Sequence, residues 1–162
     1  MQSDWTALLV EPKAILGPYK GKAPPLSTFA PYAWRAQFDD VAIAGQFMQL
    51  PEQVPPSWGS RDSARAEVVF EFHDVRLFRV DGVLERSDED DSLHGMPCGM
   101  PGQCSIEAAP EAYIDDAERG IFIPWKQFSF TQKSFSLLVE AGHVSTYCGR
   151  RASGQFGRCP PY

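Results

Sequence analysis

Hydrophobic and polar residues alternate over the longest regular stretch of the chain, which reads AEVVFEFHDVRLFRV at 66–80. Apolar side chains recur at every second position from Val68 to Phe72, the alternation shifts at His73-Asp74, and it resumes at Val75. A period of two is typical of a β-strand with one buried face. The pattern predicts either two strands that fold back at His73-Asp74 or one long bent strand.

Shorter alternating runs fill much of the remaining chain. Residues 34–50 predict one or two strands around Val41, Ile43 and Phe47, with Gly45 as a possible bulge. Regularly spaced strands with turn residues between them indicate a mainly β fold (α+β with little helix), built as an antiparallel curved sheet or sandwich with long Pro/Gly-rich loops. Further β-like runs occupy 104–108, 112–115, 120–125, 128–131, 135–139 and 143–148.

The size and composition of the chain favour a single domain over 1–162. Its 162 residues are 43% hydrophobic and 22% charged, which is ordinary for a globular protein. We expect three parts: an N-terminal helical turn and Pro/Gly-rich loop (1–33), a β core (34–148) and a loop or tail (149–162). Ser3 or Asp4 can cap the helical turn, because Trp5, Leu8 and Leu9 follow at helical spacing.

The chain is acidic, with a formal net charge of −6 and an isoelectric point near 5.0. This charge disfavours binding to nucleic acid or to an anionic membrane, and favours a basic partner. The first residues carry no lysine before their short apolar run, and Pro12 interrupts that run. The sequence therefore predicts neither a secretory signal nor a membrane span, and we expect a cytoplasmic protein.

A cluster of acidic residues is the strongest local charge feature of the sequence. Such a patch can steer a basic protein surface toward the chain, and it is also what a solvated loop looks like. The spacing does not match a calcium-binding loop. We take these residues as candidate partner contacts: Glu85, Asp88, Glu89, Asp90 and Asp91.

His94, Cys98 and Cys104, together with Cys148 or Cys159, would supply enough ligands for a structural zinc ion. Five residues separate Cys98 from Cys104, whereas zinc knuckles favour two to four. Free, reduced cysteines are the simpler interpretation. The sequence therefore predicts no metal site and no cofactor.

No catalytic motif is present in the sequence. The three histidines are His73, His94 and His143, but nothing in their spacing brings them to a nucleophile. The adjacent pair His73-Asp74, inside a strand pattern, is more typical of a bulge or turn than of a catalytic dyad. We therefore name no catalytic residue and expect a protein that is not an enzyme.

Several aromatic residues lie beside proline, glycine or charged residues, among them Tyr19, Trp34, Trp58 and Trp125. An exposed aromatic side chain is a common anchor of a protein interface. The alternative is that these rings seal loops over the sheet. Trp58 and Trp125 are taken as candidate partner anchors.

The order of these features resembles small β-rich immunity proteins that bacteria encode beside polymorphic or contact-delivered toxins. The resemblance rests on the phrases FDDVAIAGQFMQL and VVFEFHDVRLFRVDG in the central third of the chain. It implies a non-catalytic protein that binds a cognate toxin, whose surface is basic, and blocks the toxin's active site or an essential surface. A small zinc-binding or ligand-binding β protein, which can include an enzyme, is the alternative, and the oligomeric state stays open.

Overall fold

In the computed structural model, side chains are described for residues 4–58, 60–61, 64–82, 101–109, 125–132 and 135–149. Strand positions alone are described at 85–86, 93–95, 113–116, 121–123, 150–152 and 155–158. Over this part of the chain the fold is mainly β, its strands pair antiparallel, and helices are short, which confirms the predicted fold class. The principal strands are β1 (Phe29–Gln37), β2 (Asp40–Phe47), β3 (Ala66–Gly82), β6 (Gln103–Ala108), β9 (Lys126–Thr131) and β10 (Phe135–Ala152).

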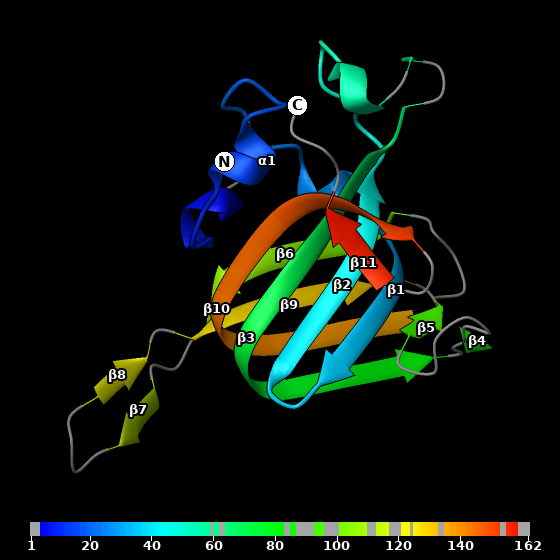
Figure 1. The fold of residues 1–162 in the computed structure, drawn as a ribbon. Coiled ribbons are helices and arrows are strands. Elements are labelled where there is room, and N and C mark those ends of the chain that lie inside the picture. Colours follow the sequence, from blue (N-terminus) through cyan, green and yellow to red (C-terminus); the bar gives the residue numbers. More distant parts are fainter. Residues whose placement is uncertain are drawn as a thin grey trace.

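Nine of the described strands form one sheet in the order β4-β5-β1-β2-β3-β10-β9-β6, with β11 (Gln155–Arg158) paired to β10 (Figure 1). β4 (Glu85–Arg86) and β5 (Leu93–Gly95) extend the sheet beyond β1. β7 (Tyr113–Asp116) and β8 (Ile121–Ile123) form a separate hairpin that lies apart from the main sheet. The pairing of β11 shows that the segment predicted as a loop or tail contains strand.

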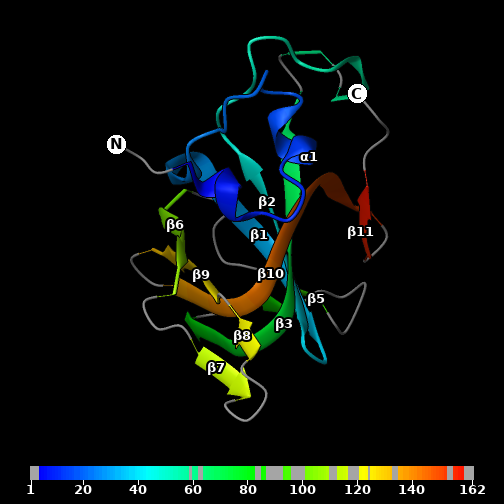
Figure 2. The same ribbon diagram turned by 90° about the vertical axis from the view of Figure 1, so that its left-hand side faces the viewer.

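The two central strands, β3 and β10, are 17 and 18 residues long and bend together (Figure 2). The register shifts at the bend, where Ala141 pairs with Val75 but Glu140 pairs with Leu77. Asp74 lies beside this bulge with φ of 55°, a backbone angle that few residues other than glycine adopt. The stretch at 66–80 is therefore one bent strand, and the two strands predicted at 135–139 and 143–148 are also one.

The bend folds the inner face of the sheet onto itself around Phe70. The ring of Phe70 lies 5.0 Å from that of Phe29 on β1 and 5.6 Å from that of Phe128 on β9, measured between centroids. Phe72 contacts Phe128 at 5.3 Å. Because β1 and β9 belong to opposite halves of the sheet, these contacts close the halves over one aromatic core.

Short helical segments cover one end of this core. They are η1 (Trp5–Leu8), α1 (Lys13–Leu16) and η2 (Leu26–Thr28), whereas η3 (Pro56–Trp58) lies in a loop that stands out from the sheet (Figure 1). The Asp4 side chain accepts a hydrogen bond from the Thr6 amide at 3.1 Å, which confirms the predicted cap. Trp5 then stacks on Phe47 at 6.1 Å. Across the described chain, no helix has the length and apolar character needed to cross a membrane.

The segment predicted as one or two strands at 34–50 is a hairpin whose first strand begins earlier, at Phe29. Its bulge is in β1, because the register shifts between Pro31 and Ala33 opposite Gly45. Gly45 serves a different purpose: a Cβ atom there would lie 2.6 Å from both the Ala30 carbonyl oxygen and the Phe29 ring. Only glycine allows the two strands to approach this closely.

Candidate functional site

The turn between β1 and β2 presents a phenylalanine to solvent. The Phe38 side chain is 99% exposed, and its φ is 55°. An L-residue with this backbone angle is destabilised by roughly 1–2 kcal/mol. The exposed ring adds nothing to folding stability and the strained backbone opposes it, so stability does not explain a phenylalanine at this position.

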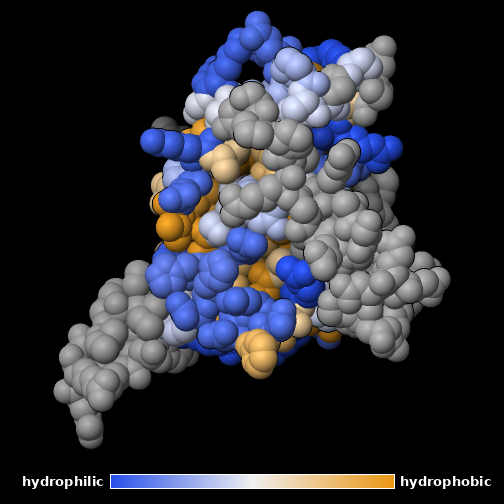
Figure 3. Space-filling view, in the orientation of Figure 1, coloured by the Kyte–Doolittle hydropathy of each residue, from blue (hydrophilic) through white to orange (hydrophobic). Residues whose placement is uncertain are grey.

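A polar groove of about 420 Å³ lies beside Phe38. Its walls include the carboxylates of Asp39, Asp40 and Glu71, the guanidinium of Arg35 and the imidazole of His73. Figure 3 shows hydrophilic residues gathered over the lower end of the sheet, where Figure 1 places the β1–β2 turn. With three carboxylates against one arginine, the groove favours a cationic group.

His73 contacts two of these carboxylates. Its Nδ1 atom lies 2.9 Å from Oδ1 of Asp40, and its Nε2 atom lies 4.0 Å from Oε2 of Glu71. A carboxylate only accepts hydrogen bonds, so Nδ1 carries the proton that binds Asp40. The second ring nitrogen faces a carboxylate rather than a hydroxyl or thiol, which is unlike the pairing of a base with a nucleophile.

A second histidine–carboxylate pair lies next to the first and joins β10 to β3. Nδ1 of His143 is 2.9 Å from Oδ2 of Asp74, and His143 is the direct register partner of His73. His73 and Asp74 thus bind different partners, and Asp74 lies at the bend, in agreement with the interpretation of the pair as a bulge. We call the group Phe38, Asp39, Asp40, Glu71, His73, Asp74 and His143 the turn surface.

The turn surface is absent from the sites predicted from sequence. Its strongest hint in the sequence is Asp39-Asp40, because aspartate is typical of turns and here interrupts an alternating run. Phe38 gave no such hint, since a phenylalanine between strand residues reads as part of a buried face. The shift of the alternation at His73-Asp74 marks the bend in the sequence, but it does not show that the bend brings Asp74 to His143.

The two tryptophans predicted as partner anchors both pack against the body of the protein. Trp58 in η3 is partly buried against the main core. Trp125 is only 7% exposed, and the Arg76 guanidinium lies 4.7 Å from its ring centroid. Trp125 therefore offers little surface to a partner in this conformation, and its place is that of a ring sealing the fold.

Most of the acidic residues predicted to contact a partner lie outside the described residues. Glu85 is placed only as a position in β4, which pairs with β5 at Gly95. The other four lie outside the described residues: Asp88, Glu89, Asp90 and Asp91. The acidic groups that the structure does place together are those of the turn surface.

The structure describes only some of the predicted zinc ligands. Among the described residues, Cys104 in β6 and Cys148 in β10 form no disulfide and are partly buried, and the Cys148 thiol donates to the Ala14 carbonyl at 3.6 Å. Burial raises the pKa of the Cys104 thiol well above its ordinary value. Cys98 and Cys159 lie outside the described residues, and His94 is placed only as a position in β5. Where side chains are described, no three His, Cys, Asp or Glu residues are arranged to hold a metal ion.

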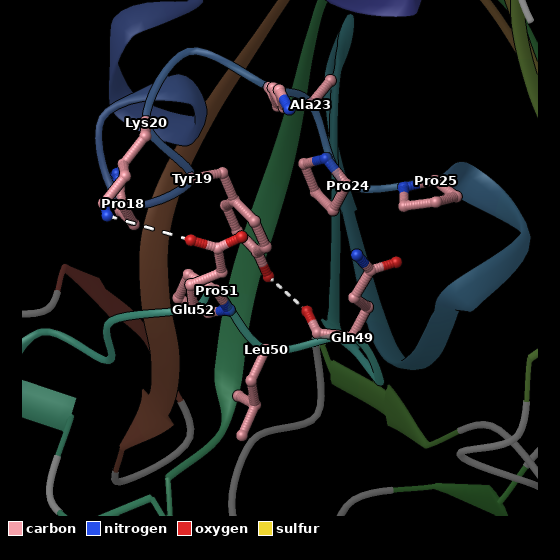
Figure 4. A pocket seen from close by; sticks show the side chains of 11 residues that line it. Pro18, Tyr19, Lys20, Ala23, Pro24, Pro25, Gln49, Leu50, Pro51 and Glu52 are labelled. Atoms are coloured by element: carbon pink, nitrogen blue, oxygen red, sulfur yellow. Dashed lines mark hydrogen bonds and ion pairs between the residues drawn. The ribbon is translucent and has the colours of Figure 1, made fainter.

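A second hollow, of about 300 Å³, lies between residues 18–25 and 49–52 (Figure 4). Four prolines and Leu50 line it, and Tyr19 points into it, donating its hydroxyl to the Gln49 carbonyl at 2.7 Å. Lys20 and Glu52 approach each other at 3.9 Å on its rim. The three tryptophans named from the sequence, Trp34, Trp58 and Trp125, line neither this hollow nor the groove.

Comparisons of the chain with protein-family models, with curated proteins and with solved structures gave no match.

Proposed function

We propose that this chain is a non-catalytic binding protein that docks a basic protein partner on the turn surface, as an immunity protein docks its cognate toxin. The exposure of Phe38 carries the proposal. A fully exposed ring at a strained position of a short turn is the form of an interface anchor, because β1 and β2 hold it in place before the partner arrives. Docking there would occlude the partner's active site or an essential surface.

The charges around Phe38 support a basic partner. Asp39, Asp40 and Glu71 line the same groove as Phe38, and the whole chain has a net charge of −6. Complementary charge speeds the encounter of two proteins and sets their orientation, while burial of an aromatic side chain supplies affinity. Phe38 would then enter an apolar pocket of the partner, with lysines or arginines of the partner against the carboxylates.

A binding assay with the protein encoded next to this chain tests the proposal. Phe38→Gly removes the ring and suits the positive φ, so the variant should fold at least as well as the parent and yet bind roughly 10- to 100-fold more weakly, which corresponds to the loss of one buried aromatic contact. Met48→Ala is the matched control. Met48 is also a large exposed apolar residue, 55% exposed, but it follows the opposite end of β2.

Growth of cells that express the neighbouring protein gives the second readout. The parent chain and Met48→Ala should restore growth if that protein is a toxin, and Phe38→Gly should not. Equal binding by Phe38→Gly and the parent chain would remove the turn surface as the docking site. A neighbouring protein that is harmless and does not bind would count against the immunity function itself.

A further inference from the structure

The hollow between residues 18–25 and 49–52 lies away from the turn surface. Residues 49–52 follow the end of β2 at Phe47, whereas Phe38 lies before the start of that strand at Asp40 (Figure 1). The hollow has a volume of about 300 Å³, at the lower end of the range for ligand pockets in proteins. It is therefore a separate site, and its size suits a small molecule.

Two side chains from outside the hollow hold its proline walls in place. Nε1 of Trp5 donates a hydrogen bond to the Pro24 carbonyl at 3.0 Å, and this contact is buried. Nη1 of Arg61 donates to the Pro51 carbonyl, also at 3.0 Å. Proline further restricts its own backbone, because its ring fixes φ. Walls fixed in this way have little freedom to lose when a ligand binds, which favours affinity.

The walls are apolar and offer few hydrogen-bond donors. Proline has no backbone N–H, and the Tyr19 hydroxyl already donates to the Gln49 carbonyl at 2.7 Å (Figure 4). Polar groups of a ligand would lose their hydrogen bonds to water against such walls, so the buried part of a ligand is expected to be apolar. The apolar residues of the lining are Pro18, Ala23, Pro24, Pro25, Leu50 and Pro51.

The rim of the hollow adds positive charge. Lys20 and Lys22 are both exposed there, and the one carboxylate of the lining belongs to Glu52. Glu52 approaches Lys20 only to 3.9 Å, and its side chain is 90% exposed, so the ion pair is weak. Two ammonium groups against one carboxylate favour an anion, although the whole chain has a net charge of −6.

The backbone at Lys20 supports a role for its side chain. Its φ is 52°, and the φ of the next residue, Gly21, is 81°. Glycine adopts such angles without strain, whereas a lysine is strained there. Folding stability therefore does not explain a lysine at position 20, and a cation is what this lysine supplies to the rim.

We propose that this hollow binds a small organic acid. The apolar body of the acid lies against the prolines, Leu50 and Tyr19. Its carboxylate accepts hydrogen bonds from the ammonium groups of Lys20 and Lys22, and such charge-assisted bonds are stronger than neutral ones. The exposed Glu52 side chain turns away, and the carboxylate of the ligand takes its place beside Lys20.

Titration of the full-length chain with cinnamate, followed through the backbone amide NMR signals, tests the site. Cinnamate should bind with a Kd of roughly 0.1–1 mM, the affinity of a well-fitted fragment of this size. It should shift the amide signals of Lys22, Ala23 and Leu50 and leave that of Phe38 unchanged. Cinnamamide has the same apolar body without the charge and should bind roughly 5- to 10-fold more weakly.

Lysine variants separate the charge of the rim from the apolar walls. The double variant Lys20→Gln, Lys22→Gln should bind cinnamate roughly 5- to 10-fold more weakly and bind cinnamamide as the parent chain does. Lys13→Gln is the matched control, because Lys13 is an exposed lysine of α1 that does not line the hollow. All three lysines are exposed, and melting temperatures would verify that each variant is folded.

Four results would overturn the proposal. They are no binding of cinnamate at millimolar concentration, amide shifts confined to other parts of the chain, equal affinities of the parent chain for cinnamate and cinnamamide, and equal losses of cinnamate binding in Lys13→Gln and in the double variant.

Discussion

Asp74 lies 2.9 Å from His143, a residue 69 positions later in the chain, and not against its neighbour His73. The relationship depends on the bend, because a φ of 55° at Asp74 turns its side chain out of the normal strand alternation. Aspartate tolerates this backbone region better than most residues do. The Asp74 backbone is thus as important to the turn surface as its carboxylate.

We predict that Asp74→Ala lowers the free energy of unfolding by about 1–2 kcal/mol, because alanine is strained at positive φ. Asp74→Gly removes the same carboxylate without the strain and should cost less. The ion pair alone adds little, since both side chains are more than half exposed. Urea denaturation of both variants and of His143→Ala separates these effects. Equal losses in Asp74→Ala and Asp74→Gly would show that the backbone angle is not the cause.

Gly45→Ala should destabilise the protein by about 1–3 kcal/mol, the usual result of overpacking a well-filled core. The added methyl group would meet the Ala30 carbonyl oxygen and the Phe29 ring at 2.6 Å, and the carbonyl belongs to the backbone and cannot rotate away. Thermal denaturation measures the effect. Gln46→Ala, one position along β2 and not fully buried, is the control and should change the melting temperature little.

Arg76 links β3 to β10 through a short contact, because its Nε atom is 2.6 Å from Oε2 of Glu140. The two side chains are only 21% and 17% exposed, and the guanidinium also covers Trp125. We predict that Arg76→Gln lowers the free energy of unfolding by about 2–3 kcal/mol, through loss of a charged hydrogen bond and a cation–π contact. A double-mutant cycle with Glu140→Gln should give a coupling energy above about 1 kcal/mol. Additive losses would mean that the two side chains act independently.

Alkaline pH should destabilise the fold, through Tyr19 and Cys104. Burial raises the pKa of both groups in the folded protein, so the unfolded chain releases these protons first. Their stabilising contribution is complete below the ordinary pKa values, about 8.5 for cysteine and 10 for tyrosine, and is lost as the pH rises above them. Urea denaturation from pH 7 to 10.5 under reducing conditions should show this decline.

Two variants separate the groups in that experiment. Cys104→Ala should flatten the decline between about pH 8.5 and 10, and Tyr19→Phe should flatten it above about pH 10. Tyr19→Phe also loses the hydrogen bond to Gln49 and should be less stable by about 1 kcal/mol at neutral pH. An unchanged slope in both variants would show that other groups cause the alkaline loss.

Local patterns in the sequence predicted the fold class and several strands. The alternation at 66–80 and around Val41 and Ile43 marks the side of each strand that faces the core. This alternation can be recognised from the residues of one strand alone. The Asp4 cap was predicted for the same reason, because it uses contacts within one turn. The choice between a hairpin and a bent strand at His73-Asp74 was not decided, since both give the same alternation up to the shift.

The candidate site depended on contacts that no local pattern encodes. His73 meets Asp40 from β2, and His143 meets Asp74 from β3, so each pair forms only after distant strands align. Phe38 is a large apolar residue of the kind usually found in a core, and its exposure follows from its place at a turn. For Trp125 the sequence suggested the opposite environment. Its neighbours along the chain suggested an exposed ring, whereas in the structure Arg76 covers the ring.

The long central strands also constrain how the chain reaches its native state. β3 and β10 each run through both halves of the sheet, and residues as distant as Val68 and Cys148 must align before either half is complete. Partners so far apart along a polypeptide meet slowly, because the intervening loop loses entropy when it closes. We expect slow, highly cooperative refolding. A chain fragment that lacks either β3 or β10 should be insoluble when expressed and should not form a small stable domain.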